Sequence, residues 1–189
     1  MQASRNTSEV KMVPPRKVPS RDERYMGLAF INAAFSKDPN TQHGAQIVTN
    51  DNEPLGAGYN GPPKEIDDAD INWTREFKIK YSYINHAEFN AILHSDRDKL
   101  NGSIIYVTGK PCPACMLKIV TYGIKKVIYF EDSKHHDTES MCISDDMRIT
   151  DDIAKKAGIV LQRFSGNLNW MRDRMEFLKN LGIFDAPSI

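Results

Sequence analysis

The chain has little cysteine, no long apolar run and no net charge, and each of these absences excludes a class of protein. Three cysteines among 189 residues are too few for a disulfide framework, and they favour a reducing compartment. No run of about 18 apolar residues exists, so no membrane span is expected. The 25 basic and 25 acidic residues cancel, which disfavours a nucleic acid polymer as partner, because its binders usually carry a basic excess.

The first 20 residues differ from the rest of the chain. They contain basic residues and Pro14, Pro15 and Pro19 but no apolar core of a secretory signal. We expect residues 1–20 to form an arm that is flexible or docks on a neighbouring subunit, and residues 21–189 to form one domain with a C-terminal helix. The expected lack of a leader and of a membrane span favours a cytoplasmic location, which would be the host cytoplasm for a viral protein.

Apolar residues recur at helical or strand spacing along most of the domain. Helices are predicted at 22–35, 86–95, 112–122, about 148–157 and 168–181, and strands at 44–49, 54–60, 103–109, 125–130 and 159–164. Ser20 or Asp22 could cap the first helix. Residues 61–84 are polar and at most partly helical, around 71–79. The alternation after residue 85 is typical of βαβ units, which predicts a partly parallel sheet with helices on both faces.

Four residues with metal-binding or acid–base side chains lie at the starts of two predicted helices. His86 and Glu88 stand in "NHAEFN", and Cys112 and Cys115 in "KPCPAC". Cysteines three residues apart share one helix face, so both sulfurs can reach one point. A sheet that holds the two helices side by side would bring His86 to the same point. Three N/S ligands suit zinc and leave one position for water, and positive helix N-termini favour thiolates and hydroxide there.

Glu88 lies two residues from the proposed ligand His86, too awkwardly placed to share the metal but close enough to meet a water on it. Bound zinc lowers the pKa of water to about 7. A carboxylate at that place can take the proton and pass it to a leaving group. Alone, the Cys-x-x-Cys pair could be a redox pair, and His-Ala-Glu could belong to an ordinary capped helix. Both motifs in this order, separated by one βα unit, favour the zinc site.

Two observations bear on whether such a site stays open. A fourth ligand from His43, His94, His135 or His136 would close the zinc site and prevent the chemistry. The third cysteine, Cys142, lies in a predicted polar loop and is interpreted as an incidental thiol.

These motifs resemble the deoxycytidylate (dCMP) deaminases of the cytidine deaminase superfamily, and the chain looks like a phage or viral member. The likeness covers about residues 22–164 and rests on "SKDPN" (36–40), "GYNG" (58–61), "HAEFNAIL" (86–93), "YVTGKPCPAC" (106–115), "GIKKVIY" (123–129) and "HD" (136–137). It implies a three-layer α/β/α sandwich with a mixed five-stranded sheet. His43 and a long segment at 138–152 depart from the usual pattern, and residues 1–20 and the last helix lie outside it.

The resemblance implies zinc-dependent hydrolysis of dCMP to dUMP and ammonia, which supplies thymidylate synthesis. Zinc would bind His86, Cys112 and Cys115, and Glu88 would transfer protons. Six residues are implied as substrate contacts: the N–H of Ala87 and the carbonyl of Lys110 on the base, Asn60 on the sugar 3′-hydroxyl, Ser36 and Lys37 on the phosphate, and Tyr129 beside the base.

The resemblance also implies regulation. Family members are commonly homohexamers, activated by dCTP and inhibited by dTTP with a divalent cation such as Mg²⁺. The effector site near "GYNG" would lie at a subunit contact, with Asn40, Gly61 and Lys64 as candidates. Two alternatives stay open. One is a deaminase of dCTP or of adenosine or guanine bases, and the other is a non-catalytic zinc-stabilised nucleotide sensor, which has no need of Glu88.

Overall fold

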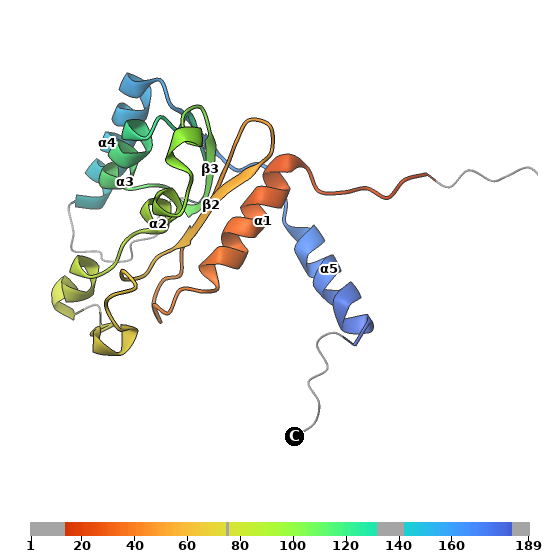
Figure 1. The fold of residues 1–189 in the computed structure, drawn as a ribbon, viewed down its shortest axis with the longest axis horizontal. Helices are drawn as coiled ribbons and strands as arrows, with labels where there is room; N and C mark the ends of the chain where they lie inside the picture. The colour runs from red at the N-terminus through yellow and green to blue at the C-terminus, as the bar shows by residue number, and fades with distance from the viewer. Residues whose placement is uncertain (1–13, 75, 132–141, 183–189) are drawn as a thin grey trace, which may run out of the picture.

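The computed structural model describes residues 14–74, 76–131 and 142–182 (Figure 1). The helices are α1 (Arg21–Ala33), α2 (Ala87–Leu93), α3 (Pro113–Thr121), α4 (Cys142–Ala157) and α5 (Asn169–Asn180). The strands are β1 (Gly44–Val48), β2 (Pro54–Tyr59), β3 (Ile104–Gly109), β4 (Lys126–Glu131) and β5 (Val160–Arg163). Three short 3-10 helices are η1 (Asp68–Asp70), η2 (Glu76–Ser82) and η3 (Arg97–Lys99).

The strands form one mixed sheet in the order β2-β1-β3-β4-β5. β1 pairs antiparallel with β2 and with β3, whereas β3, β4 and β5 run parallel. The predicted hairpin and the predicted parallel units are thus both present, and the mixed five-stranded α/β fold is confirmed. Within the described part of the chain, no helix is long and apolar enough to cross a membrane.

Helices cover both faces of the sheet (Figure 1). The larger core packs α2, α3 and α4 against one face, through buried residues such as Ala91, Ile119 and Ala154 over Ile105 and Val127. The smaller core packs α1 against the other face; its buried members are Tyr25, Met26, Ala29, Val48, Ile104, Tyr106 and Ile128. α2 carries the His86 motif and α3 carries the Cys112 motif, so both motifs lie on the same side of the sheet.

The start of α1 shows how local sequence determines a helix end. The Ser20 hydroxyl accepts a hydrogen bond from the Glu23 N–H (3.3 Å), and the Glu23 carboxylate accepts one from the Ser20 N–H (2.9 Å). This is a complete capping box, which satisfies two N–H groups at the helix start. Of the two predicted caps, the structure selects Ser20. The second Glu23 oxygen accepts from the Asn167 N–H (3.1 Å) and so connects the cap to the segment before α5.

Glycines in the hairpin let two helices approach its backbone closely. A Cβ atom at Gly58 would fall well inside contact distance of the Ala91 nitrogen and the Ala87 carbonyl oxygen, and 2.9 Å from the Ala91 Cα. On the other face, a Cβ at Gly44 would overlap the carbonyl oxygen of Ala29 in α1. Glycine at these positions therefore sets the distance of α1 and α2 from the sheet.

Three boundaries differ from the sequence predictions. The partly helical stretch expected around 71–79 begins later, because Ile71 is extended (φ −91°, ψ 127°) and the 3-10 helix η2 covers Glu76–Ser82. α4 begins at Cys142 instead of about 148, so the interpretation of Cys142 as a loop residue was wrong; the polar run there belongs to a helix. The strand predicted at 125–130 is shifted by one residue, because β4 covers Lys126–Glu131.

Candidate metal centre and active site

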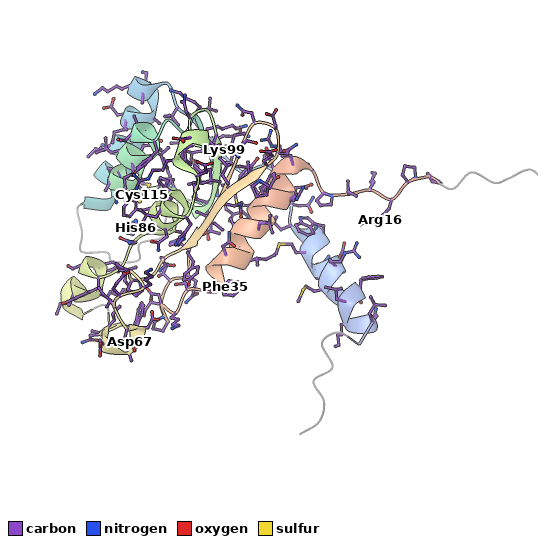
Figure 2. All side chains as sticks on the ribbon, in the orientation of Figure 1. Arg16, Phe35, Asp67, His86, Lys99 and Cys115 are labelled. Carbon is purple, nitrogen blue, oxygen red and sulfur yellow. The ribbon has the colours of Figure 1, made fainter. Side chains whose placement is uncertain are left out.

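His86, Cys112 and Cys115 converge at the adjoining ends of α2 and α3 (Figure 2). The His86 Nδ1 lies 3.5 Å from the Cys112 Sγ and 3.4 Å from the Cys115 Sγ. Zinc bonds of about 2.0–2.1 Å to nitrogen and about 2.3 Å to sulfur, at tetrahedral angles, place such atoms roughly 3.6 Å apart. The three side chains therefore fit a tetrahedral zinc ion without rearrangement.

The positions of these ligands follow from the two helix starts. His86 is the N-cap of α2 and Cys112 the N-cap of α3, and neither side chain accepts a capping hydrogen bond from its own helix. Pro113 follows Cys112 at the first helical position, where proline is favoured. Both N-cap side chains are directed instead toward each other. Among the described residues, no fourth histidine, cysteine or acid joins the group, so neither His43 nor His94 closes it.

Hydrogen bonds among the three candidate ligands shift the pKa values of all three side chains. A hydrogen bond from Cys115, aided by one from His86, lowers the pKa of Cys112 to about 3 despite burial. The hydrogen bond to Cys112 raises the pKa of His86 to about 9. The same interaction with Cys112, together with burial, raises the pKa of the Cys115 thiol. Hydrogen bonds thus join the three side chains, and a divalent cation that binds them must displace their protons.

Glu88 lies in the first turn of α2 and is only 7% exposed. Burial raises the pKa of its carboxyl above the usual value, against the opposing effect of His86. A raised pKa suits a carboxyl that must both accept and release a proton near neutral pH. By contrast His86 is exposed and Cys112 half-buried, so the group is open to solvent on one side.

The segment before Cys112 is held by α4. The Thr150 hydroxyl, which is fully buried, donates to the Pro111 carbonyl (3.0 Å). The Lys110 Nζ forms an ion pair with Asp151 (2.8 Å) and lies 5.7 Å from the centroid of the Tyr129 ring. None of these three contacts was predicted from the sequence. α4 therefore supports the loop that carries both the Lys110 carbonyl and a metal ligand.

Asn60 is buried at the end of β2, where its side chain bonds to the chain ahead of β1. Its Oδ1 accepts from the His43 N–H (2.7 Å) and its Nδ2 donates to the Thr41 carbonyl (3.0 Å). The His43 Nδ1 in turn lies 3.1 Å from the Thr108 Oγ1. An amide has two donor hydrogens and two acceptor lone pairs, so these bonds leave Asn60 with capacity for one more partner on each atom.

The other predicted contact residues lie around this site in different settings. Ala87 opens α2, so the helix itself provides no acceptor for its N–H. Ser36 donates to the Asn60 carbonyl (2.8 Å). Lys37 is exposed and pairs with Asp68 in η1. Tyr129 is half-buried and packs against the larger core.

The candidate effector residues do not share one setting. Asn40 donates to the Trp73 carbonyl (2.9 Å). Gly61 exchanges two backbone hydrogen bonds with Asn85 (3.1 and 3.0 Å), directly before His86. Lys64 is 91% exposed. The "HD" pair at 136–137 lies outside the described residues.

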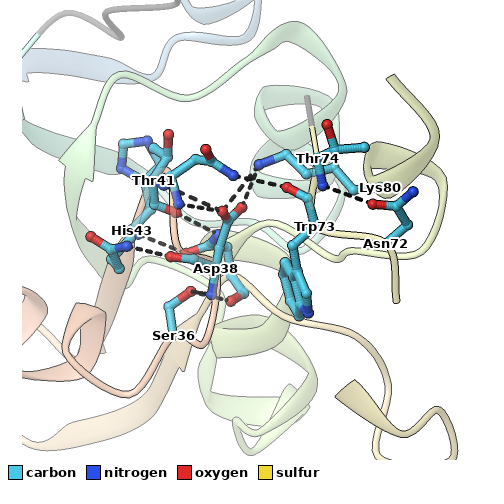
Figure 3. Close-up of polar contacts among 11 residues, drawn as sticks. Ser36, Asp38, Thr41, His43, Asn72, Trp73, Thr74 and Lys80 are labelled. Atoms are coloured by element: carbon cyan, nitrogen blue, oxygen red, sulfur yellow. Dashed lines mark hydrogen bonds and ion pairs between the residues drawn. The ribbon is translucent and has the colours of Figure 1, made fainter. Parts of the chain in front are cut away.

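The structure also reveals a buried ion pair that sequence reasoning missed. Lys80 and Asp38 lie 42 residues apart and meet in a polar cluster between the loop 36–43 and the segment 61–84 (Figure 3). No local pattern marks Lys80, because a lysine is almost always assigned to the surface.

Comparisons with known proteins agree with this site. A family model, the cytidine and deoxycytidylate deaminase zinc-binding region, matches residues 19–131. Human deoxycytidylate deaminase is 41% identical over 121 residues, which cover 62% of this chain and 67% of that protein. The mouse deoxycytidylate deaminase is 37% identical over 147 residues, covering 76% and 79%. The apo structure of dCMP deaminase from the cyanophage S-TIM5 shares the fold, with a TM-score of 0.58, 24% identity, and coverage of 78% of this chain and 100% of that chain.

The family model spans more than half of the chain, and its match includes the three converging ligands and the buried glutamate. The chain therefore belongs to the zinc-binding cytidine and deoxycytidylate deaminase family of hydrolytic deaminases.

Proposed function

We propose that this protein hydrolyses dCMP to dUMP and ammonia with one zinc ion per subunit. The observation that carries the proposal is the group of His86, Cys112 and Cys115 at zinc-binding separations, with the buried Glu88 in the same helix turn as His86. The animal relatives are named deoxycytidylate deaminases, which supports dCMP as the substrate. A non-catalytic nucleotide sensor would need the three ligands but not Glu88.

Zinc bound to these ligands supplies a water whose pKa is about 7, and hence a nucleophile at neutral pH. Glu88 would take one proton from the attacking water and deliver it to N3 of the pyrimidine as the C4–O bond forms. It would then take the second proton from the new C4 hydroxyl and pass it to the amino group, so that the C4–N bond breaks, ammonia leaves and C4 becomes a carbonyl. Burial of Glu88 strengthens its interactions with the charge that develops in the transition state.

The remaining side of the site would bind and orient the nucleotide. The Ala87 N–H donates to the pyrimidine carbonyl, and the Lys110 carbonyl accepts from the 4-amino group. Asn60 holds the 3′-hydroxyl through the capacity that its backbone contacts leave. Ser36 and Lys37 contact the phosphate, for which the exposed Lys37 exchanges its half-buried partner Asp68. Tyr129 packs near the base.

Replacing Glu88 by alanine or glutamine tests the chemical assignment. Both variants are expected to retain zinc but to lose turnover by about two to four orders of magnitude, the usual contribution of a general acid–base group. Glu53→Gln, at an exposed position before β2, is the matched control and keeps wild-type turnover. Substantial activity in the Glu88 variants would refute the role of this carboxyl.

A turnover panel of dCMP, dCTP, cytidine and adenosine tests the substrate. The expected order places dCMP first. If the enzyme prefers dCTP or adenosine, that compound is its substrate and the deaminase chemistry stands. If zinc-loaded protein turns over none of the four compounds, the result favours the non-catalytic nucleotide sensor.

Regulation by dCTP and dTTP with Mg²⁺, at a homohexamer contact near Asn40, Gly61 and Lys64, belongs to the proposal as well. It is supported by the family resemblance, and gel filtration with either nucleotide tests it. The arm at residues 1–20, the single domain from residue 21, the cytoplasmic location and the viral origin stay predictions.

A further inference from the structure

Lys80 and Asp38 form an ion pair that is buried on both sides. The Lys80 Nζ lies 3.0 and 2.8 Å from the two Asp38 carboxylate oxygens, and the side chains are 1% and 4% exposed. Burial alone raises the pKa of Asp38, but the hydrogen bonds from Lys80 and from backbone N–H groups outweigh it and lower this pKa overall. The Asp38 carboxylate is therefore ionised at a position where an unpaired charge is very costly, and the ion pair with Lys80 compensates it.

Asp38 also organises the loop that it belongs to. Its Oδ1 accepts from the Asn40 N–H (2.9 Å) and the Thr41 N–H (3.4 Å), and its own N–H donates to the Ser36 hydroxyl (3.4 Å). The Gln42 side chain donates to the Asp38 carbonyl. Figure 3 shows polar contacts around Asp38 as a whole, with Ser36, Thr41 and Lys80 beside it. The conformation of residues 36–42 thus depends on Asp38, and Lys80 connects that loop to η2.

A continuous series of contacts joins this loop to the metal centre. Ser36 and Thr41 bond to Asn60, as described above. The next residue, Gly61, exchanges backbone hydrogen bonds with Asn85, which precedes the ligand His86. Because Asn60 is the proposed sugar contact, the loop 36–42 would border the sugar-and-phosphate side of the nucleotide site. Lys80 contacts this loop from η2 and is shielded from solvent.

Stability alone does not explain a buried ion pair. Apolar residues of similar volume often stabilise a protein as well or better, because desolvation of two charges offsets their attraction. The location of Asp38 indicates another reason. Its carboxylate lies in the same short loop as Ser36 and Lys37, where an uncompensated negative charge would repel an approaching phosphate.

We infer that Asp38 and Lys80 are positioning residues that give the enzyme its preference for a nucleotide over a nucleoside. Asp38 fixes the loop that presents Ser36 and Lys37, and Lys80 cancels the Asp38 charge so that a phosphate dianion can bind there. This inference rests on the proposed function and extends it to the source of phosphate selectivity. Neither residue touches the reacting atoms.

The test compares kcat and KM for dCMP and deoxycytidine in the zinc-loaded full-length protein. Lys80→Met leaves the Asp38 charge unpaired and is expected to raise the KM for dCMP about tenfold or more, the loss of one contact to a charged group. The kcat/KM of Lys80→Met for deoxycytidine should differ from the wild-type value by less than about threefold. The double variant Asp38→Asn/Lys80→Met removes both charges, keeps an acceptor for the backbone N–H groups, and should show a smaller loss of selectivity. Lys80→Arg retains a cation and should keep part of the preference for dCMP over deoxycytidine that Lys80→Met loses.

The double variant guards against unfolding of the single one, because removal of both buried charges avoids an uncompensated ion. Lys99→Met, at an exposed lysine in η3, is the control and keeps wild-type selectivity. Equal losses on both substrates in Lys80→Met, or a folded double variant that loses as much selectivity as Lys80→Met, would overturn the inference and leave the proposed function intact. A wild-type enzyme that turns over neither substrate would overturn the proposed function and this inference together.

Discussion

Substitution of Gly58 by alanine tests how the sheet positions α2, the helix that carries His86 and Glu88. The new Cβ would lie 2.9 Å from the Ala91 Cα and closer still to two other backbone atoms of α2. Carbon atoms in ordinary contact are about 3.5–4.0 Å apart, so α2 must move away from β2 by roughly 1 Å. The overlapping atoms of Ala87 and Ala91 belong to the backbone, so no side-chain rotation can relieve the overlap. We therefore expect a destabilisation of about 3 kcal/mol, at the upper end of the usual cost of overpacking.

The same displacement moves His86 and Glu88, because both lie at the start of α2. A 1 Å misplacement of catalytic groups costs about 100-fold in rate, so kcat/KM for dCMP should fall by that order. Urea denaturation and steady-state turnover measure the two effects. Ala57→Val, at the exposed position between Gly56 and Gly58, is the control for a larger side chain in β2. A Gly58→Ala enzyme with wild-type stability and turnover would refute the idea that backbone contact sets the helix position.

Three further predictions concern separate parts of the molecule. Thr150→Val removes the donor to the buried Pro111 carbonyl and should lower the free energy of unfolding by about 1–3 kcal/mol, read from chemical denaturation; an unchanged midpoint would contradict it. Hydrogen bonds from Ser20 and Asn167 lower the pKa of Glu23, so its stabilising contribution is present above its unfolded pKa of 4.5 and is lost as pH falls through the lower folded value. Glu23→Gln should therefore flatten the decline of thermal stability below pH 4.5, and parallel acid curves would count against this. Removal of metal by a chelator should abolish turnover and lower the melting temperature, with recovery on addition of zinc, whereas full activity in metal-free protein would exclude the metal centre.

The features predicted well from the sequence are those that depend on neighbouring residues. Apolar periodicity located the helices and strands, and the sequence around Ser20 and Glu23 contains a complete capping box. The metal centre could be predicted for the same reason. Its ligands lie at helix starts that short motifs specify, and the successive β2–α2–β3 and β3–α3–β4 connections place α2 and α3 on the same face of the sheet.

The features that were missed depend on contacts between distant segments. The Lys80–Asp38 pair joins residues 42 positions apart, and nothing in "KIKYSY" distinguishes its buried lysine from an exposed one. The Thr150–Pro111 bond likewise depends on how α4 packs after the fold is complete. The early start of α4 was missed because its polar face resembles a loop in composition.

The mutual hydrogen bonds between Gly61 and Asn85 close the base of the long excursion between β2 and α2. The segment between these two residues leaves and rejoins the domain at one point. Its length therefore does not affect the position of His86. Changes of length elsewhere in the segment 62–84 are therefore compatible with an unchanged position of His86, provided that Lys80 keeps its place beside Asp38.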